Sequence, residues 1–167
     1  DVRKVALLAL GRIGHPDALA PVIARVNDPD RDVAWRALYA LAFIPDVEHK
    51  ATQVVADKLM KDPEVRTTLF ATYALARFYD PNGAKALLAA KDHPDYQVRK
   101  NAVLGLAALE NPETVIGLMA LAEDAEMNIR RLALISLGIL ANRPVLGEEP
   151  PEEARARQEV ARRAQDT

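Results

Sequence analysis

A self-repeat with a period close to 31 residues constrains the fold of this chain more than any other feature. Five segments align: "DVRKVALLALGRIG", "DVAWRALYALAFIP", "RTTLFATYALARFY", "QVRKNAVLGLAALE" and "NIRRLALISLGILA". Their equivalent leucines are spaced by 31, 34, 31 and 31 residues, and they are Leu10, Leu41, Leu75, Leu106 and Leu137. Self-similarity at such a period is typical of stacked supersecondary units.

Four further segments lie between the aligned ones: "HPDALAPVIARVND", "PDVEHKATQVVADKLMKD", "DPNGAKALLAAKDH" and "NPETVIGLMALAED". Each opens with proline close to Asp, Asn or Glu, which is a helix-start signal. No segment shows the strict alternation of a strand. We therefore predict repeats of two short antiparallel helices whose stacking creates a continuous core. The third repeat departs from the period, and we place its three extra residues in the helix that precedes Pro63.

The composition agrees with a helical array and excludes several function classes. Hydrophobic residues make up 50% of the chain but aromatic residues only 5%, which favours helices. The net charge of −2 gives no overall attraction to nucleic acid or anionic membranes. The lack of cysteine excludes disulfides and thiol catalysis. We expect a cytoplasmic location, and we interpret the abrupt start in mid-helix as a sign that the chain is a fragment of a longer array.

The pair "DVRKVALLALGRIG" and "HPDALAPVIARV", which recurs as "QVRKNAVLGLAAL" and "NPETVIGLMAL", resembles HEAT-like repeats of the short type named after phycobilin lyases. The resemblance covers residues 1–144 and leaves residues 145–167 as a linker plus a C-terminal helix or cap. It implies an all-α, right-handed superhelix (an armadillo-type α-solenoid) of about five two-helix repeats. The "VR" helices would line its concave face.

The resemblance also implies roles for one motif position and for the array as a whole. Arg3, Arg99 and Arg130 occupy the motif's arginine position and would bridge to acidic turn residues of adjacent repeats. The second repeat has Ala34 there, so we expect this contact to be missing. The family binds partners far more often than it catalyses reactions, and we therefore predict a binding protein.

A helical projection divides the second segment into two apolar stripes. At 100° per residue, Val33, Ala37 and Leu41 fall together with Ile44 and form the predicted core stripe. Trp35 and Tyr39 point away from that stripe, roughly 200–240° from Val33. In the family's geometry this direction is the concave surface.

The same face in all five repeats is rich in aromatic and basic residues. It contains six of the eight aromatic residues of the chain, and Asp32 is its one acid besides the terminal residue. Tyr, Trp and Arg typically anchor interfaces. The candidate partner-binding residues are Arg31, Trp35, Arg36, Tyr39, Arg66, Tyr73, Arg77, Tyr96, Lys100 and Arg131. Two alternatives remain open: the cations form a merely solvated face, and Phe43 and Phe70 only pack against the adjacent repeat.

Other motifs give no catalytic, cofactor or metal site. "HPD" occurs at residues 15–17 and 93–95, in two kinds of turn that need helix starters, and "DPDRD" lacks the glycine and glutamate of a calcium loop. The three histidines have no zinc-ligand spacing. We predict a non-enzymatic scaffold that binds an acidic or amphipathic segment of a protein partner. A nucleic-acid-binding groove, a chromophore lyase-like protein and a structural spacer remain alternatives, and the oligomeric state stays open.

Overall fold

A computed structural model describes residues 1–109 and 111–142, and every regular element within these ranges is helical. This confirms the predicted all-α solenoid. The elements are α1 (Val2–Ile13), the 3₁₀ turn η1 (Pro16–Ala18) with α2 (Leu19–Ile23), α3 (Arg31–Leu41), α4 (Thr52–Lys61), α5 (Val65–Phe78), η2 (Pro81–Gly83) with α6 (Ala84–Ala90), α7 (Tyr96–Leu109), α8 (Pro112–Leu121) and α9 (Met127–Ala141).

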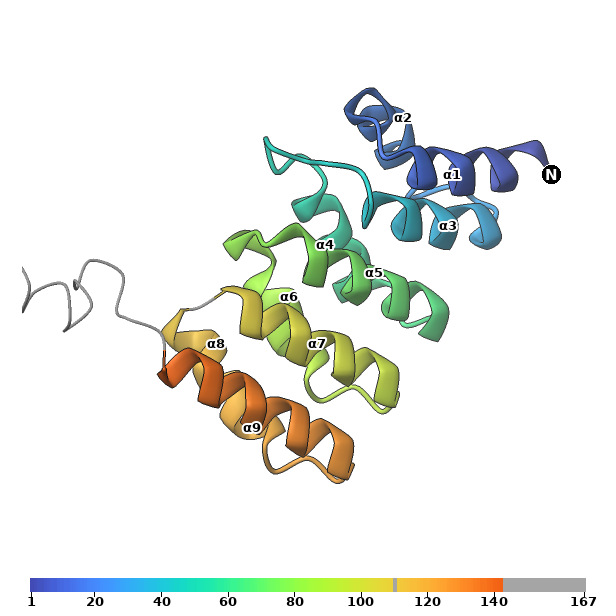
Figure 1. The fold of residues 1–167 in the computed structure, drawn as a ribbon. Helices are drawn as coiled ribbons and strands as arrows, with labels where there is room; N and C mark the ends of the chain where they lie inside the picture. The colour runs from blue at the N-terminus through green and yellow to red at the C-terminus, as the bar shows by residue number, and fades with distance from the viewer. Residues whose placement is uncertain (110, 143–167) are drawn as a thin grey trace, which may run out of the picture.

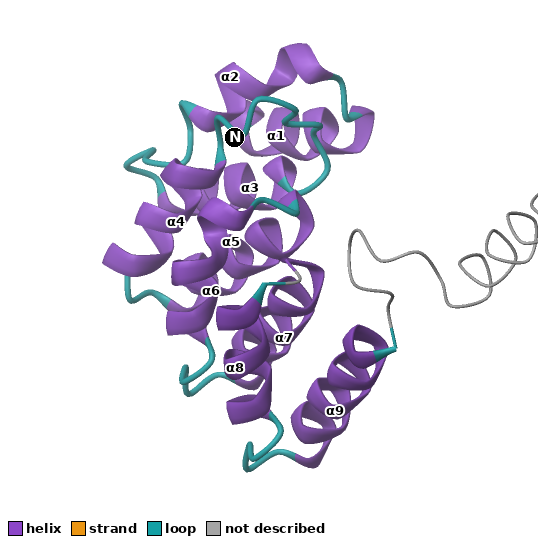
Figure 2. Cartoon of the chain, turned by 90° about the vertical axis from the view of Figure 1, so that its left-hand side faces the viewer, coloured by secondary structure: helices purple, strands orange, loops and turns teal. Residues whose placement is uncertain are grey.

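The helices form two parallel rows (Figure 1). The first row contains α1, α3, α5, α7 and α9, each packed on the next, and the second row contains α2, α4, α6 and α8. Both rows bow in the same sense, with the first row on the inner side (Figure 2). The solvent-facing side of the first row is therefore the concave face of the array, and we call it the first-row face.

The turns that open the first-row helices share one hydrogen-bonding device. A side chain accepts a hydrogen bond from the amide two residues later, which orients the chain into the next helix. The four donor–acceptor distances are 3.0, 3.1, 3.0 and 2.8 Å, and the acceptors are Asp28, Asp62, His93 and Asp124. The "HPD" at residues 93–95 thus belongs to a helix-start turn.

The core follows the predicted stripe. Val33, Ala37 and Leu41 are fully buried, and small residues let neighbouring first-row helices approach closely. A Cβ at Gly11 would lie 2.9 Å from the Cα atom of Ala40 on the next helix, closer than packed atoms tolerate. Close packing of neighbouring first-row helices therefore requires glycine or alanine where the helices touch.

The arginine ladder implied by the family resemblance is present at Arg3 and Arg99 but not at Arg130. Arg3 donates to the Asp28 carboxylate at 3.1 Å, and Arg99 binds Asp124 through two hydrogen bonds of 2.7 and 3.0 Å. Each arginine thus holds the aspartate 25 residues later, in the turn that opens the next repeat. Arg130 donates instead to the carbonyls of its own preceding turn, Asp124 and Ala125, at 2.7 and 2.8 Å.

The irregular third repeat corrects one expectation. The helix α4, at 10 residues, is no longer than α8, so the three extra residues do not lengthen it. They lie in the loop before Thr52, where the Asp46 carboxylate accepts hydrogen bonds from the amides of Lys50 and Ala51. A loop absorbs an insertion without shifting the packed apolar stripe, whereas a longer helix would not. Ala34 makes no ladder contact, and Asp62 pairs with Lys58 at 3.0 Å instead.

Candidate functional site

Five aromatic rings form one cluster on the first-row face. Trp35 stacks on Phe70 with ring centroids 4.8 Å apart and an interplanar angle of 17°. Tyr39 stacks on Tyr73 at 6.0 Å and meets Phe70 edge-on at 5.6 Å. Phe43 meets Tyr39 at 5.0 Å. We call these five residues the aromatic cluster, and all of them are half-buried.

The cluster arises from the repeat itself. Trp35 and Tyr39 are four residues apart and share one side of α3, and Phe43 follows four residues later in the turn just beyond the end of α3. Phe70 and Tyr73 are three residues apart on α5 and share the facing side. The cluster thus bridges two repeats, and part of each ring stays open to solvent. The structure places Trp35 and Tyr39 in this joint aromatic surface, where they are not isolated projecting rings.

Arginines cover the edges of the aromatic cluster. The guanidinium groups of Arg36 and Arg66 lie 4.1 and 5.5 Å from the centroid of the Trp35 ring. Arg77 lies 5.0 Å from the Phe43 ring, and its Nε atom donates to the Ala42 carbonyl at 2.7 Å, at the end of α3. Cation–π contacts of this kind hold the planar groups in fixed orientations. The guanidinium groups are therefore positioned before any ligand arrives.

One carboxylate lies among these cations. Asp32 accepts a hydrogen bond from Trp35 Nε1 at 3.0 Å, and Lys4, Arg36 and Arg66 lie within 3.5, 3.8 and 3.4 Å of its oxygens. The hydrogen bond from Trp35 is the main cause that keeps the pKa of Asp32 below its ordinary value, and Lys4 and Arg36 add positive potential. Asp32 is therefore ionised at neutral pH, and three cations from three successive first-row helices converge there.

The remaining first-row candidates lie further along the array. Tyr96 and Lys100 are half-buried on α7, and Arg131 is exposed on α9. Within residues 1–109 and 111–142, neither Lys100 nor Arg131 forms an ion pair. The predicted residues therefore divide into a joined group on α3 and α5 and single residues on α7 and α9.

Sequence reasoning did not foresee an apolar groove on the same face. It has a volume of about 490 Å³ and spans α5, α7 and α9. Tyr73 and Arg77 line its near end, so it continues the aromatic cluster, while Leu104 and Ile139 provide exposed apolar surface. In the sequence, Leu104 and Ile139 occupy positions of the first-row face, and this was the signal from which the groove could have been predicted.

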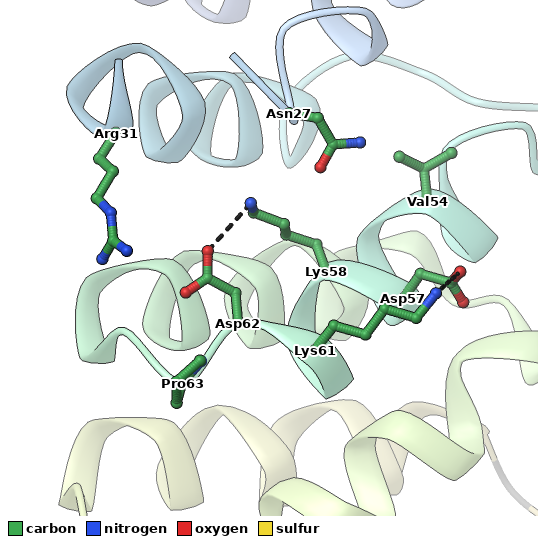
Figure 3. A pocket seen from close by; sticks show the side chains of 8 residues that line it. All are labelled: Asn27, Arg31, Val54, Asp57, Lys58, Lys61, Asp62 and Pro63. Atoms are coloured by element: carbon green, nitrogen blue, oxygen red, sulfur yellow. Dashed lines mark hydrogen bonds and ion pairs between the residues drawn. The ribbon is translucent and has the colours of Figure 1, made fainter. Parts of the chain in front are cut away.

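Arg31 lies elsewhere. It belongs to the first turn of α3 and lines a pocket of about 520 Å³ at the edge of the array, next to the α4 helix (Figure 3). Ion pairs of 3.0 Å (Lys58–Asp62) and 2.8 Å (Lys61–Asp57) run along the α4 wall of this pocket. Their spacing of four residues is visible in the sequence, but it predicts a solvated helix face and not a pocket.

Comparison with known proteins places this geometry in a family. The family model of the HEAT repeats matches residues 1–76, 52–138 and 83–165. The chain belongs to the HEAT-repeat family. No curated protein sequence matches this HEAT array.

Among solved structures, human deoxyhypusine hydroxylase in complex with glycerol is similar to this HEAT array. The two are 21% identical with a TM-score of 0.61 over 75% of this chain. The match covers 44% of the hydroxylase chain, so this HEAT array corresponds to less than half of that protein. At this identity the likeness shows the fold alone.

The described part of the HEAT array contains neither a cluster of metal-ligating side chains nor a membrane-spanning helix. No three His, Cys, Asp or Glu side chains converge there to hold a metal ion. Helices of the described residues are also too short or too polar to cross a bilayer.

Proposed function

We propose that this HEAT array is a non-enzymatic protein-interaction scaffold that binds a partner segment on its first-row face. The observation that carries the proposal is the aromatic cluster, because five rings remain half-open to solvent on the concave side under positioned arginines. Tyr, Trp and Arg provide most of the binding energy at typical interfaces. The clustered rings are held by their neighbours, so little side-chain entropy is lost when a partner docks.

The charges on this face favour an acidic or amphipathic segment. Arg66, Lys100 and Arg131 project from three successive first-row helices, while Asp32 is already surrounded by cations. Packed helices lie about 8–10 Å apart, and an extended chain advances about 3.3–3.6 Å per residue. An extended partner would thus place roughly every third side chain over a new repeat. Carboxylates at that spacing would meet the cations, and apolar side chains would meet the aromatic cluster and the groove.

Selection of a displayed random-peptide library against the full chain tests this proposal. We expect the selected peptides to combine Asp or Glu with aliphatic or aromatic residues. Charge reversal at Arg66 and Arg131 should weaken their binding at least tenfold in fluorescence anisotropy, because two favourable charge contacts become repulsive. The loss should shrink as the salt concentration rises.

The matched control reverses two charges in the second row of the array, at Lys61 on α4 and Lys85 on α6. Both residues are exposed, and the change in net charge is the same. This variant should bind the selected peptides as the wild type does. Equal weakening by both variants would mean that only net charge matters, which contradicts docking on the first-row face.

A further inference from the structure

The outer side of α9 differs from every other first-row helix. Leu134 is 58% exposed, although four residues at the equivalent position of the earlier repeats are almost completely buried. Their exposed fractions are 3%, 0%, 0% and 0%, for Leu7, Leu38, Thr72 and Val103. The position therefore normally faces packed protein, whereas on α9 more than half of the residue's surface is open to solvent.

The missing cover lies on the side of the elements that follow each first-row helix. Leu7 is buried although, among the described residues, no helix precedes α1, so its cover comes from the elements after it. Gly138 shows the same gap: a Cβ there meets nothing within 4 Å, whereas at the equivalent Gly11 it meets the next helix. The side of α9 that faces onward along the array is thus an unpartnered apolar surface.

We propose that residues 152–165 of this chain dock on that surface as the second helix of the fifth repeat. Pro151 directly precedes the segment and Glu152 is its first residue, and the same pair of residue types, Pro112 and Glu113, starts α8. Glutamates come first and arginines later, as the helix dipole favours. The match of the HEAT family model to residues 83–165 includes this segment.

The composition of the segment fits a second-row position. Ala156, Val160 and Ala164 recur every four residues and would form one narrow apolar stripe. A stripe of small residues has a precedent in α6, whose buried residues are three alanines and Leu87. The exposed Leu134 side chain would lie against Val160, and Arg155 and Arg162 would project from the opposite side of the helix.

The tether favours this occupant over a second copy of the chain. Ten residues, 142–151, join the end of α9 to the segment. Such a linker reaches up to about 33–36 Å, several times the 8–10 Å between packed helices. Tethering also gives an effective concentration in the millimolar range, which exceeds that of a second copy in dilute solution.

Engineered cysteines test the docking directly, because the chain has none of its own. In the full chain carrying Leu134→Cys and Val160→Cys, mild oxidation should give an intramolecular disulfide, seen by peptide mapping under non-reducing conditions. The control pair, Leu104→Cys with Val160→Cys, places a cysteine at another exposed position, on the first-row face, and should stay unlinked. A dimer linked through the cysteine introduced on α9, or equal linking in both pairs, would overturn the proposal.

Hydrogen exchange of the unmodified full chain gives a second readout that does not depend on the cysteines. Amides of residues 152–165 should exchange at least tenfold more slowly than the unstructured rate. Leu134→Asp should abolish this protection and leave that of α3 and α5 unchanged. Unprotected exchange of the segment in the wild type, or protection that survives Leu134→Asp, would overturn the proposal.

Discussion

Replacing Arg99 with alanine should lower the free energy of unfolding by about 3–5 kcal/mol, because it leaves a buried carboxylate without its partner. The Arg99 and Asp124 side chains are only 13% and 8% exposed. Arg99 also donates to the carbonyls of His93 and Pro94, at 2.9 Å each. One side chain therefore ties the turn before α7 to the turn before α9, and urea denaturation at pH 7 measures the loss.

Arg3→Ala is the matched control, since it removes the same ladder position from the first repeat. The Arg3 side chain is 47% exposed, and its partner Asp28 keeps a second contact with Arg25 at 3.4 Å. We expect a loss of about 1 kcal/mol or less, as is usual for exposed pairs. Equal losses at both positions would contradict this explanation, because they would show that the burial of the pair does not set its contribution to stability.

The cost of Arg99→Ala should also depend on pH. The hydrogen bonds from Arg99 are the main cause that holds the pKa of Asp124 below its ordinary value of 3.8. A lowered folded-state pKa stabilises the protein above the unfolded value, and this contribution is lost as the pH falls through the folded-state value. The difference between wild type and variant should therefore be largest near neutral pH and shrink below pH 3.8. A constant difference across this range would contradict the ion-pair explanation.

Replacing both Trp35 and Tyr39 with alanine should weaken the binding of a selected acidic peptide about 100-fold, because each lost anchor ring costs about 1.4 kcal/mol. Trp35 and Tyr39 hold the centre of the aromatic cluster through Phe70. Their removal also takes away the Trp35 ring, over which the guanidinium groups of Arg36 and Arg66 lie. Fluorescence anisotropy with the labelled peptide measures the loss.

Two controls separate binding from folding. Trp35→Phe with Tyr39→Phe keeps rings at both positions and should retain most of the affinity. Ile116→Ala with Met119→Ala removes two exposed apolar side chains from α8 in the second row and should leave binding unchanged. Circular dichroism and thermal unfolding verify that each variant is folded. If the alanine variant stays folded and binds normally, the aromatic cluster is not the docking surface.

The fold could be predicted from the sequence because each repeat carries its own complete set of local signals. The stripe of Val33, Ala37 and Leu41 is set by helical periodicity alone, and the structure buries all three. Proline and acidic residues mark the helix starts, and the structure uses Asp28 and Asp124 in the predicted turns. In a solenoid each repeat contacts only its neighbours, so these local signals add up to the architecture.

The arrangement of the candidate site could be predicted only in part, because it depends on contacts between repeats. Periodicity placed Trp35 and Tyr39 on one face, but the stacking of Trp35 on Phe70 depends on the rotation of α5 against α3. Arg31 is the first residue of α3, where a shift of one residue moves a side chain from the first-row face to the edge of the array. The structure places Arg31 in the pocket at that edge. Composition alone does not show which of residues 46–50 leave the helical path, so the sequence predicts a longer helix where the structure has a loop before α4.

Side-chain footprinting by hydroxyl radicals tests the central claim most directly, with the full chain and a selected acidic peptide. The rings of Trp35, Tyr39 and Tyr73 should become less reactive when the peptide binds. Met60 and Met119, exposed on α4 and α8, provide oxidation-prone reporters on the second row and should react as before. Protection of these methionines with unchanged oxidation of the rings would contradict a docking surface on the concave face.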